Sequence, residues 1–166
     1  ALQGLELVLD WLPKAVEDGQ NLVARERMLI AATMGAAAFQ KGLGMIYSLA
    51  HPLSSRCHMH HGLANALLMP AAISFIENSD LNEDQKLRVS RVRSFFTDRG
   101  YVTGSLADMC RQFNENLGIA LGLSDHGVLE KDLELLAEEA VEDPCHPTNM
   151  IPVGFADLLS VYKAAM

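Results

Sequence analysis

Residues 41–70, KGLGMIYSLAHPLSSRCHMHHGLANALLMP, decide how this sequence is interpreted. The apolar run MIYSLAH at 45–51 predicts a short helix, and Pro52 is expected to end it because proline cannot donate a helical hydrogen bond. The polar segment SSRCHMHHG predicts a loop, and a second apolar helix is expected over 63–77. The sequence therefore places a histidine-rich loop between two helices that belong to the core.

Further helical segments flank this stretch on both sides. An apolar stripe with three- and four-residue steps predicts a first helix up to the turn EDGQ at 17–20. The remaining candidates are 22–40, 82–96, 105–117, 130–142 and 157–166. Alternation with a period of two residues does not persist anywhere, and no dinucleotide-binding or Walker glycine pattern is present. We therefore expect residues 1–166 to form a single all-α domain, a bundle of about seven helices.

Composition excludes several functional classes. The chain has 49% hydrophobic residues in 166, enough for a core, and a formal charge of −8, which opposes binding to nucleic acid. The most apolar stretch, 63–76, has 14 residues and contains Pro70, so it is too short to cross a membrane. Three scattered cysteines, Cys57, Cys110 and Cys145, are expected to be inert free thiols. Free thiols fit a reducing compartment, so the chain is expected to be cytoplasmic; the segment ALQGLELVLD, with acids and no basic region, is not expected to be a signal peptide.

Four of the six histidines lie within eleven residues of the central stretch. His58 and His60 are expected to be exposed, whereas His51 and His61 each lie beside apolar residues at a helix edge. Tyr47 and His51 are four positions apart and share a helix face, and the loop returns His61 towards that face. Imidazole binds metals and relays protons near neutral pH, so this face is a candidate functional site.

The central stretch resembles the signature of the iron-containing (group III) alcohol dehydrogenases, GLG-x-x-H-x-x-AH-P-L, a loop, then HG-x-x-NA-x-x-L-P. The preceding segment at 12–39 resembles the family's helices before the signature, and ADLLSVYKAAM at 156–166 resembles its terminal helix. The resemblance implies the carboxy-terminal, dehydroquinate synthase-like helical domain only. The NAD(P)-binding α/β domain of complete members is expected to be absent from this chain.

The resemblance also implies site residues. Family members bind iron or zinc through an aspartate and a histidine that precede the residues seen here, the histidine of GLG-x-x-H, and the histidine of HG. His61 matches the last ligand, while Tyr47 replaces the histidine of GLG-x-x-H and, as a neutral phenol, ligates poorly. His51 matches the family histidine beside substrate and nicotinamide, which implies a catalytic role in proton relay or substrate positioning.

Outside the signature, HPTNMIPV at 146–153 resembles the family segment that normally contains NPR, with Met150 and Ile151 in place of Pro and Arg. His146 is expected either to line the cleft or to bond to the backbone of its own loop. The acidic helix at 130–142 is interpreted as a solvated face.

Three functions follow from these observations. The leading hypothesis is the metal and substrate cleft of an NAD(P)-dependent alcohol and aldehyde oxidoreductase, inactive as this isolated fragment. The alternative is a non-catalytic helical binding or oligomerisation module, whose open face lacks the missing N-terminal domain that covers it in complete members and is capped by a partner or a second copy. A third possibility is a metal- or small-molecule-binding protein that uses the histidine loop.

Overall fold

A computed structural model describes residues 1–102 and 104–166 and confirms the all-α class. Within these residues there are eight α-helices and no strand. The helices are α1 (Leu2–Glu17), α2 (Leu22–Ala38), α3 (Met45–Arg56), α4 (His61–Glu77), α5 (Glu83–Thr97), α6 (Leu106–Asn116), α7 (Leu133–Glu142) and α8 (Phe155–Ala164). Short 3₁₀ turns extend α2 and precede α7.

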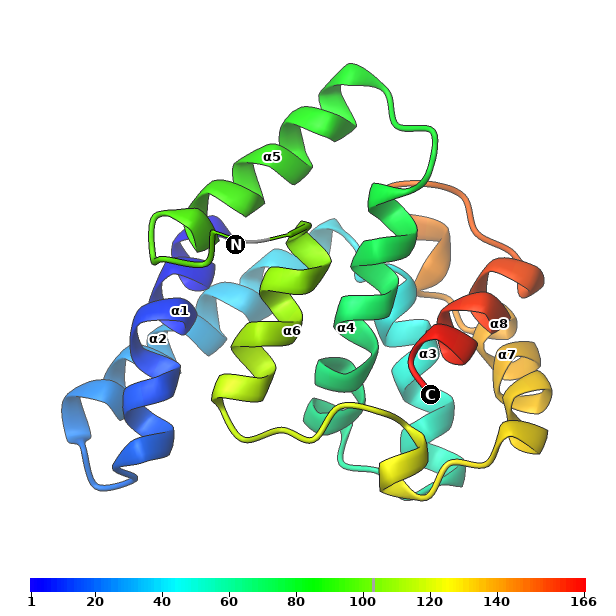
Figure 1. Ribbon diagram of the computed structural model, residues 1–166, viewed down its shortest axis with the longest axis horizontal. Helices are drawn as coiled ribbons and strands as arrows, with labels where there is room; N and C mark the ends of the chain where they lie inside the picture. The colour runs from blue at the N-terminus through cyan, green and yellow to red at the C-terminus, as the bar shows by residue number, and fades with distance from the viewer. Residues whose placement is uncertain (103) are drawn as a thin grey trace.

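The helices surround two clusters of buried side chains. The larger cluster is formed mainly by α3, α4, α7 and α8, and its fully buried members include Leu49, Leu53, Leu68, Leu136 and Tyr162. The smaller cluster lies between α1, α5 and α6; its members are Leu9, Phe96, Leu106, Met109, Cys110 and Phe113. Helices α4 and α6 pack against each other and join the two halves, while α5 lies across one end of the molecule (Figure 1).

Polar caps set the starts of several helices close to the expected positions. The Asn82 side chain accepts from the Gln85 backbone amide, and the Gln85 side chain accepts from the Asn82 backbone amide. Ser105 and Asp108 form the same reciprocal pair at the start of α6. Each capping box satisfies two amides that the helix itself leaves without partners. The helices therefore begin directly after the capping residues, one residue later than the expected starts at 82 and 105.

Helix α3 differs from expectation because it does not end at Pro52. The helix continues to Arg56, and a bond from the Cys57 amide to the Leu53 carbonyl closes its last turn. Proline removes one helical hydrogen bond, but Pro52 and Leu53 are both buried in the core, which offsets that loss. His51 is therefore in the middle of a helix, and the expectation that it lies at a helix edge is wrong. His61, in contrast, is the first residue of α4, as expected.

No single helix in the part of the chain that the structure describes combines the length and apolar composition needed to cross a membrane. One pair, Leu22–Lys41 with Met45–Arg56, meets that criterion jointly but is bent by 109°.

Candidate functional site

The glycine loop before α3 is bonded to a distant segment, residues 146–149. The Leu43 amide donates to Thr148 Oγ1 at 3.1 Å, and the Met45 amide donates to Asn149 Oδ1 at 3.3 Å, so a side chain remote in sequence caps α3. Gly42 has a φ of 103°, and a Cβ there would lie 2.4 Å from Thr148 Cβ. Only glycine permits this approach, which sets the direction in which α3 leaves the loop.

Tyr47, His51 and His61 form one aromatic cluster between α3 and the start of α4. The Tyr47 ring meets the two imidazoles edge-on, with centroid distances of 5.9 Å to His51 and 5.2 Å to His61. The imidazoles are stacked, with centroids 5.3 Å apart and planes inclined by 18°. The structure thus brings together all three residues that the sequence selected, as the four-residue spacing and the returning loop predict.

Asp143, directly after α7, is hydrogen-bonded to this cluster through His51. Its Oδ2 lies 2.6 Å from His51 Nδ1, while Oδ1 accepts from Ser48 Oγ at 2.9 Å and from the Cys145 amide at 2.8 Å. Burial raises the pKa of this carboxyl, but the bonds from His51, Cys145 and Ser48 together outweigh burial and lower the pKa from 3.8 to about 2. The carboxylate is therefore ionised at neutral pH and fully occupied by donors.

Tyr47 and His61, where the resemblance implies metal ligands, fit a divalent ion poorly by themselves. Burial, followed by the neighbouring His51 and His60, lowers the pKa of His61, so His61 presents a neutral imidazole suited to a metal. Burial and the nearby Cys145 raise the pKa of Tyr47, so its phenol stays protonated and is a weak ligand. A stable catalytic metal site takes about three protein ligands, of which this pair supplies one.

A second group of side chains that could ligate a metal consists of His51, Asp143 and Cys145. Ligand atoms of His51, Asp143 and Cys145 all lie within 4.8 Å of one another. The carboxylate oxygens already accept three hydrogen bonds, and burial together with Asp143 raises the pKa of the Cys145 thiol to about 11. An ion would have to displace these bonds and a firmly held proton, so hydrogen bonding explains the group better than metal binding does.

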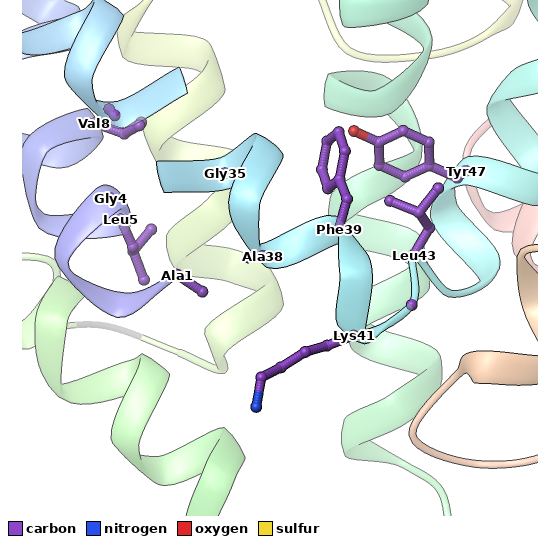
Figure 2. A pocket seen from close by; sticks show the side chains of 12 residues that line it. Ala1, Gly4, Leu5, Val8, Gly35, Ala38, Phe39, Lys41, Leu43 and Tyr47 are labelled. Atoms are coloured by element: carbon purple, nitrogen blue, oxygen red, sulfur yellow. The ribbon is translucent and has the colours of Figure 1, made fainter. Parts of the chain in front are cut away.

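An apolar cavity of about 490 Å³ opens beside Tyr47. It lies between the start of α1, the end of α2 and the glycine loop, and the Phe39 and Tyr47 rings meet edge to face at 5.4 Å along one wall (Figure 2). Lys41 lines the rim and extends away from Tyr47 (Figure 2). Tyr47 thus faces both the histidine pair and this cavity.

Of the other histidines, His60, His126 and His146 bond to the backbone. His60 caps α4 by accepting from the Gly62 amide at 3.2 Å, and His58 is exposed with a φ of 52°. His146 Nε2 lies 2.7 Å from the Val141 carbonyl, so this residue follows the expectation of a loop histidine bonded to backbone. The cysteines are free, as expected. Neither His58 nor His60 joins the cluster of Tyr47, His51 and His61.

The sequence interpretation missed Asp143 and Ser48. Asp143 stands at the end of a segment interpreted as a solvated acidic face, and its selection as a site residue requires knowing that α7 packs against α3. The available signal was local: an Asp-Pro pair ends a helix immediately before the resembling segment at 146–153. Ser48 carried a weaker signal, a lone hydroxyl in an apolar helix, one turn before His51.

The comparisons with known proteins identify the family of this chain. Residues 1–166 match the family model described as the Fe-containing alcohol dehydrogenase family, C-terminal. The chain is 35% identical over 175 residues to 4-hydroxybutyrate dehydrogenase of Cupriavidus necator, covering 100% of the chain and 44% of that relative. It is 31% identical over 171 residues to NAD-dependent methanol dehydrogenase of Bacillus methanolicus, with the same coverages of 100% and 44%.

Solved structures show the same helical arrangement. A 1,3-propanediol oxidoreductase superposes with a TM-score of 0.84 at 26% identity, covering 99% of this chain and 44% of that one. An archaeal halo-thermophilic alcohol dehydrogenase from a Red Sea brine pool gives a TM-score of 0.86 at 25% identity, with coverages of 99% and 43%. The chain spans less than half the length of these relatives. It belongs to the iron-containing alcohol dehydrogenase family and corresponds to the family's C-terminal helical domain.

Proposed function

We propose that this chain forms the helical wall of the substrate cleft in an NAD(P)-dependent oxidoreductase of small alcohols and aldehydes. The observation that carries the proposal is the cluster of Tyr47, His51 and His61, with His51 bonded to Asp143 at 2.6 Å. Membership of the family supports the reaction class, and the names of the relatives, which include methanol and 4-hydroxybutyrate dehydrogenases, support small primary alcohols as substrates.

The proposed reaction divides the work between two halves of the protein. Oxidation of an alcohol sends a hydride from carbon to the nicotinamide and a proton from the hydroxyl to a base. His51 is the residue proposed to take that proton, because its side chain is 43% exposed while Asp143 bonds to its Nδ1. The nucleotide-binding half is the partner that supplies the nicotinamide. The compartment we propose is the cytoplasm, where the three free thiols would stay reduced.

The experiment compares the chain alone with the chain joined to a nucleotide-binding half. In the joined protein, this chain replaces the matched region of the Cupriavidus necator 4-hydroxybutyrate dehydrogenase. Methanol, 1,3-propanediol and 4-hydroxybutyrate are offered with NAD⁺ or NADP⁺, and reduced nicotinamide is measured by absorbance. The chain alone should give no alcohol-dependent reduction, and the joined protein should turn over at least one alcohol. The parent enzyme, rejoined at the same boundary, controls for the junction.

The alternative, a binding or oligomerisation module, is favoured by one observation on α2. Leu22 and Leu29 are 77% and 71% exposed, and Phe39 beyond the helix is 47% exposed. Exposed apolar surface of this kind promotes association. Light scattering over a range of concentrations tests the alternative: a dimer or larger species supports it, whereas a monomer at high concentration opposes it.

Metal content separates both proposals from a metal-binding protein. With Tyr47 in place of a histidine ligand, protein purified without chelator or tag should hold well under one iron or zinc ion per chain. A full equivalent of metal would show that the histidine loop binds an ion without the missing ligands, and would favour the metal-binding hypothesis.

A further inference from the structure

The bonds around Asp143 fix the orientation of its carboxylate. Oδ1 accepts from Ser48 Oγ and from the Cys145 amide, and these two donors come from different parts of the chain, α3 and the segment after α7. The Asp143 side chain is only 13% exposed, so water does not compete strongly for these positions. With Oδ1 occupied in this way, Oδ2 is directed at His51 Nδ1, at 2.6 Å.

This arrangement determines which nitrogen of His51 carries the proton. An ionised carboxylate can only accept hydrogen bonds, so Nδ1 must be the donor. In a neutral ring the lone pair is then on Nε2, and within the described residues no protein group bonds to Nε2. Stacking on His61 at 5.3 Å and the edge contact with Tyr47 at 5.9 Å hold the plane of the ring. The imidazole is thus fixed in both tautomer and orientation.

We propose that Asp143 is the positioning residue of the site, which holds His51 in the Nδ1–H tautomer so that Nε2 is the proton acceptor. The assignment of the proton donor as an alcohol hydroxyl rests on the proposed function; the tautomer does not. In the oxidation direction the O–H bond breaks and its proton passes to Nε2, while the C–H bond breaks and its hydride passes to the nicotinamide. Asp143 stays ionised throughout and stabilises the imidazolium that forms.

The substitution Asp143→Asn tests this role with little change in shape. The Cys145 amide can only donate, so the new side chain keeps its carbonyl oxygen there and turns its NH₂ group towards His51. Nδ1 must then accept, and His51 should change to the Nε2–H tautomer. Ser48→Ala is the matched control, because it removes one bond to Asp143 and leaves the bond to His51 in place.

Nitrogen-15 NMR of the imidazoles in the 166-residue chain gives a readout that does not depend on activity. In mildly alkaline buffer, where free imidazole is neutral, His51 should be the Nδ1–H tautomer in the wild-type chain and in Ser48→Ala, and the Nε2–H tautomer in Asp143→Asn. His51→Gln identifies the His51 signals. A wild-type His51 in the Nε2–H form overturns the proposal, even if the Asn variant does not fold.

Turnover by the joined protein then separates the two proposals. Asp143→Asn should lower kcat at least tenfold with a small change in KM, since the lost group acts on the transition state. If Asp143→Asn changes His51 to the Nε2–H tautomer but leaves kcat unchanged, the positioning role is overturned and the proposed function is not affected. A wild-type joined protein that folds but is inactive contradicts the proposed function, while the NMR result still decides whether Asp143 sets the tautomer.

Discussion

The α3–α4 pair and the α1–α2 pair have similarly apolar sequences, but the structure uses them differently. In α3 and α4 the apolar residues are in the core: Leu49, Leu53 and Leu68 have no exposed surface. In α2 only Ala24 and Ala31 are buried, while Leu22 and Leu29 face outward. The difference is one of packing: the first pair is held in the core, whereas Leu22 and Leu29 on the outer face of α2 are exposed among the residues that the structure describes.

The contrast extends to the polar residues. Along α3, Ser48 and His51 are both bonded to Asp143, a residue distant in sequence. On α2, Thr33 bonds to the Leu29 carbonyl in its own helix, and Arg25 bonds to the carbonyl of nearby Gly19. Long-range polar contacts fix side-chain geometry, so the α3–α4 pair has the features of a site and the outer α2 face has those of a contact surface.

The largest effect is expected from removing a core side chain. Leu68→Ala in α4 should lower the free energy of unfolding by about 2–5 kcal/mol, because it leaves a cavity in a site with no exposed surface. Leu29→Ala on α2, with 71% exposure, should change it by less than about 0.5 kcal/mol. Urea denaturation followed by circular dichroism measures both. Similar losses for the two variants would remove the contrast between the helix pairs.

Asp143→Asn should have the next largest effect, and that effect should depend on pH. Folding lowers the pKa of this carboxyl from 3.8 to about 2, so its contribution is present above the unfolded value and disappears as pH falls towards 2. At neutral pH the variant should be less stable by about 1–2 kcal/mol. Denaturation at several pH values measures the difference, and a difference that stays constant from neutral pH to pH 2 would contradict this account.

A smaller loss is expected from Tyr162→Phe. Tyr162 is fully buried and its hydroxyl donates to the Leu49 carbonyl at 2.6 Å, which joins α8 to α3 behind the site. Removal of this bond should lower the free energy of unfolding by about 1 kcal/mol. Tyr101→Phe, at a partly buried tyrosine that packs against the smaller cluster, is the matched control and should lose less in the same denaturation assay. An equal or greater loss for Tyr101→Phe would mean that α8 does not support α3 in this way.

The smallest effect on stability is expected from Leu29→Gln on the outer face of α2. Since the side chain is largely exposed, the free energy of unfolding should stay within about 0.5 kcal/mol of wild type. Binding of a fluorescent dye to exposed apolar surface should nevertheless decrease, because the substitution interrupts the apolar face. Unchanged dye binding would show that this face is not the apolar surface that the dye detects.

Much of the fold was predictable from local signals. Asn82 and Ser105 mark helix starts because their side chains bond within a few residues, and the turn after Glu17 ends α1 where the sequence indicates. The end of α3 was not predictable from the sequence, since the helix continues past Pro52, where Pro52 and Leu53 are buried in the core. Local rules identify helices reliably, but tertiary packing decides whether a proline interrupts one.

The same distinction applies to the site. Tyr47, His51 and His61 were predictable because a four-residue spacing and a short returning loop are local features. Asp143 is 92 positions from His51, and nothing in its local sequence indicates which helix it contacts. The side chain that determines the tautomer of His51 therefore required the packing of α7 against α3 to be known.

The most direct test of the central claim is alcohol-dependent reduction of NAD⁺ or NADP⁺, measured in parallel on two proteins. One is this chain alone, and the other is this chain joined to the nucleotide-binding half of the 4-hydroxybutyrate dehydrogenase. The account predicts no turnover by the chain alone and turnover by the joined protein, lost in His51→Gln. Turnover by the chain alone, or none by a correctly folded joined protein, would contradict it.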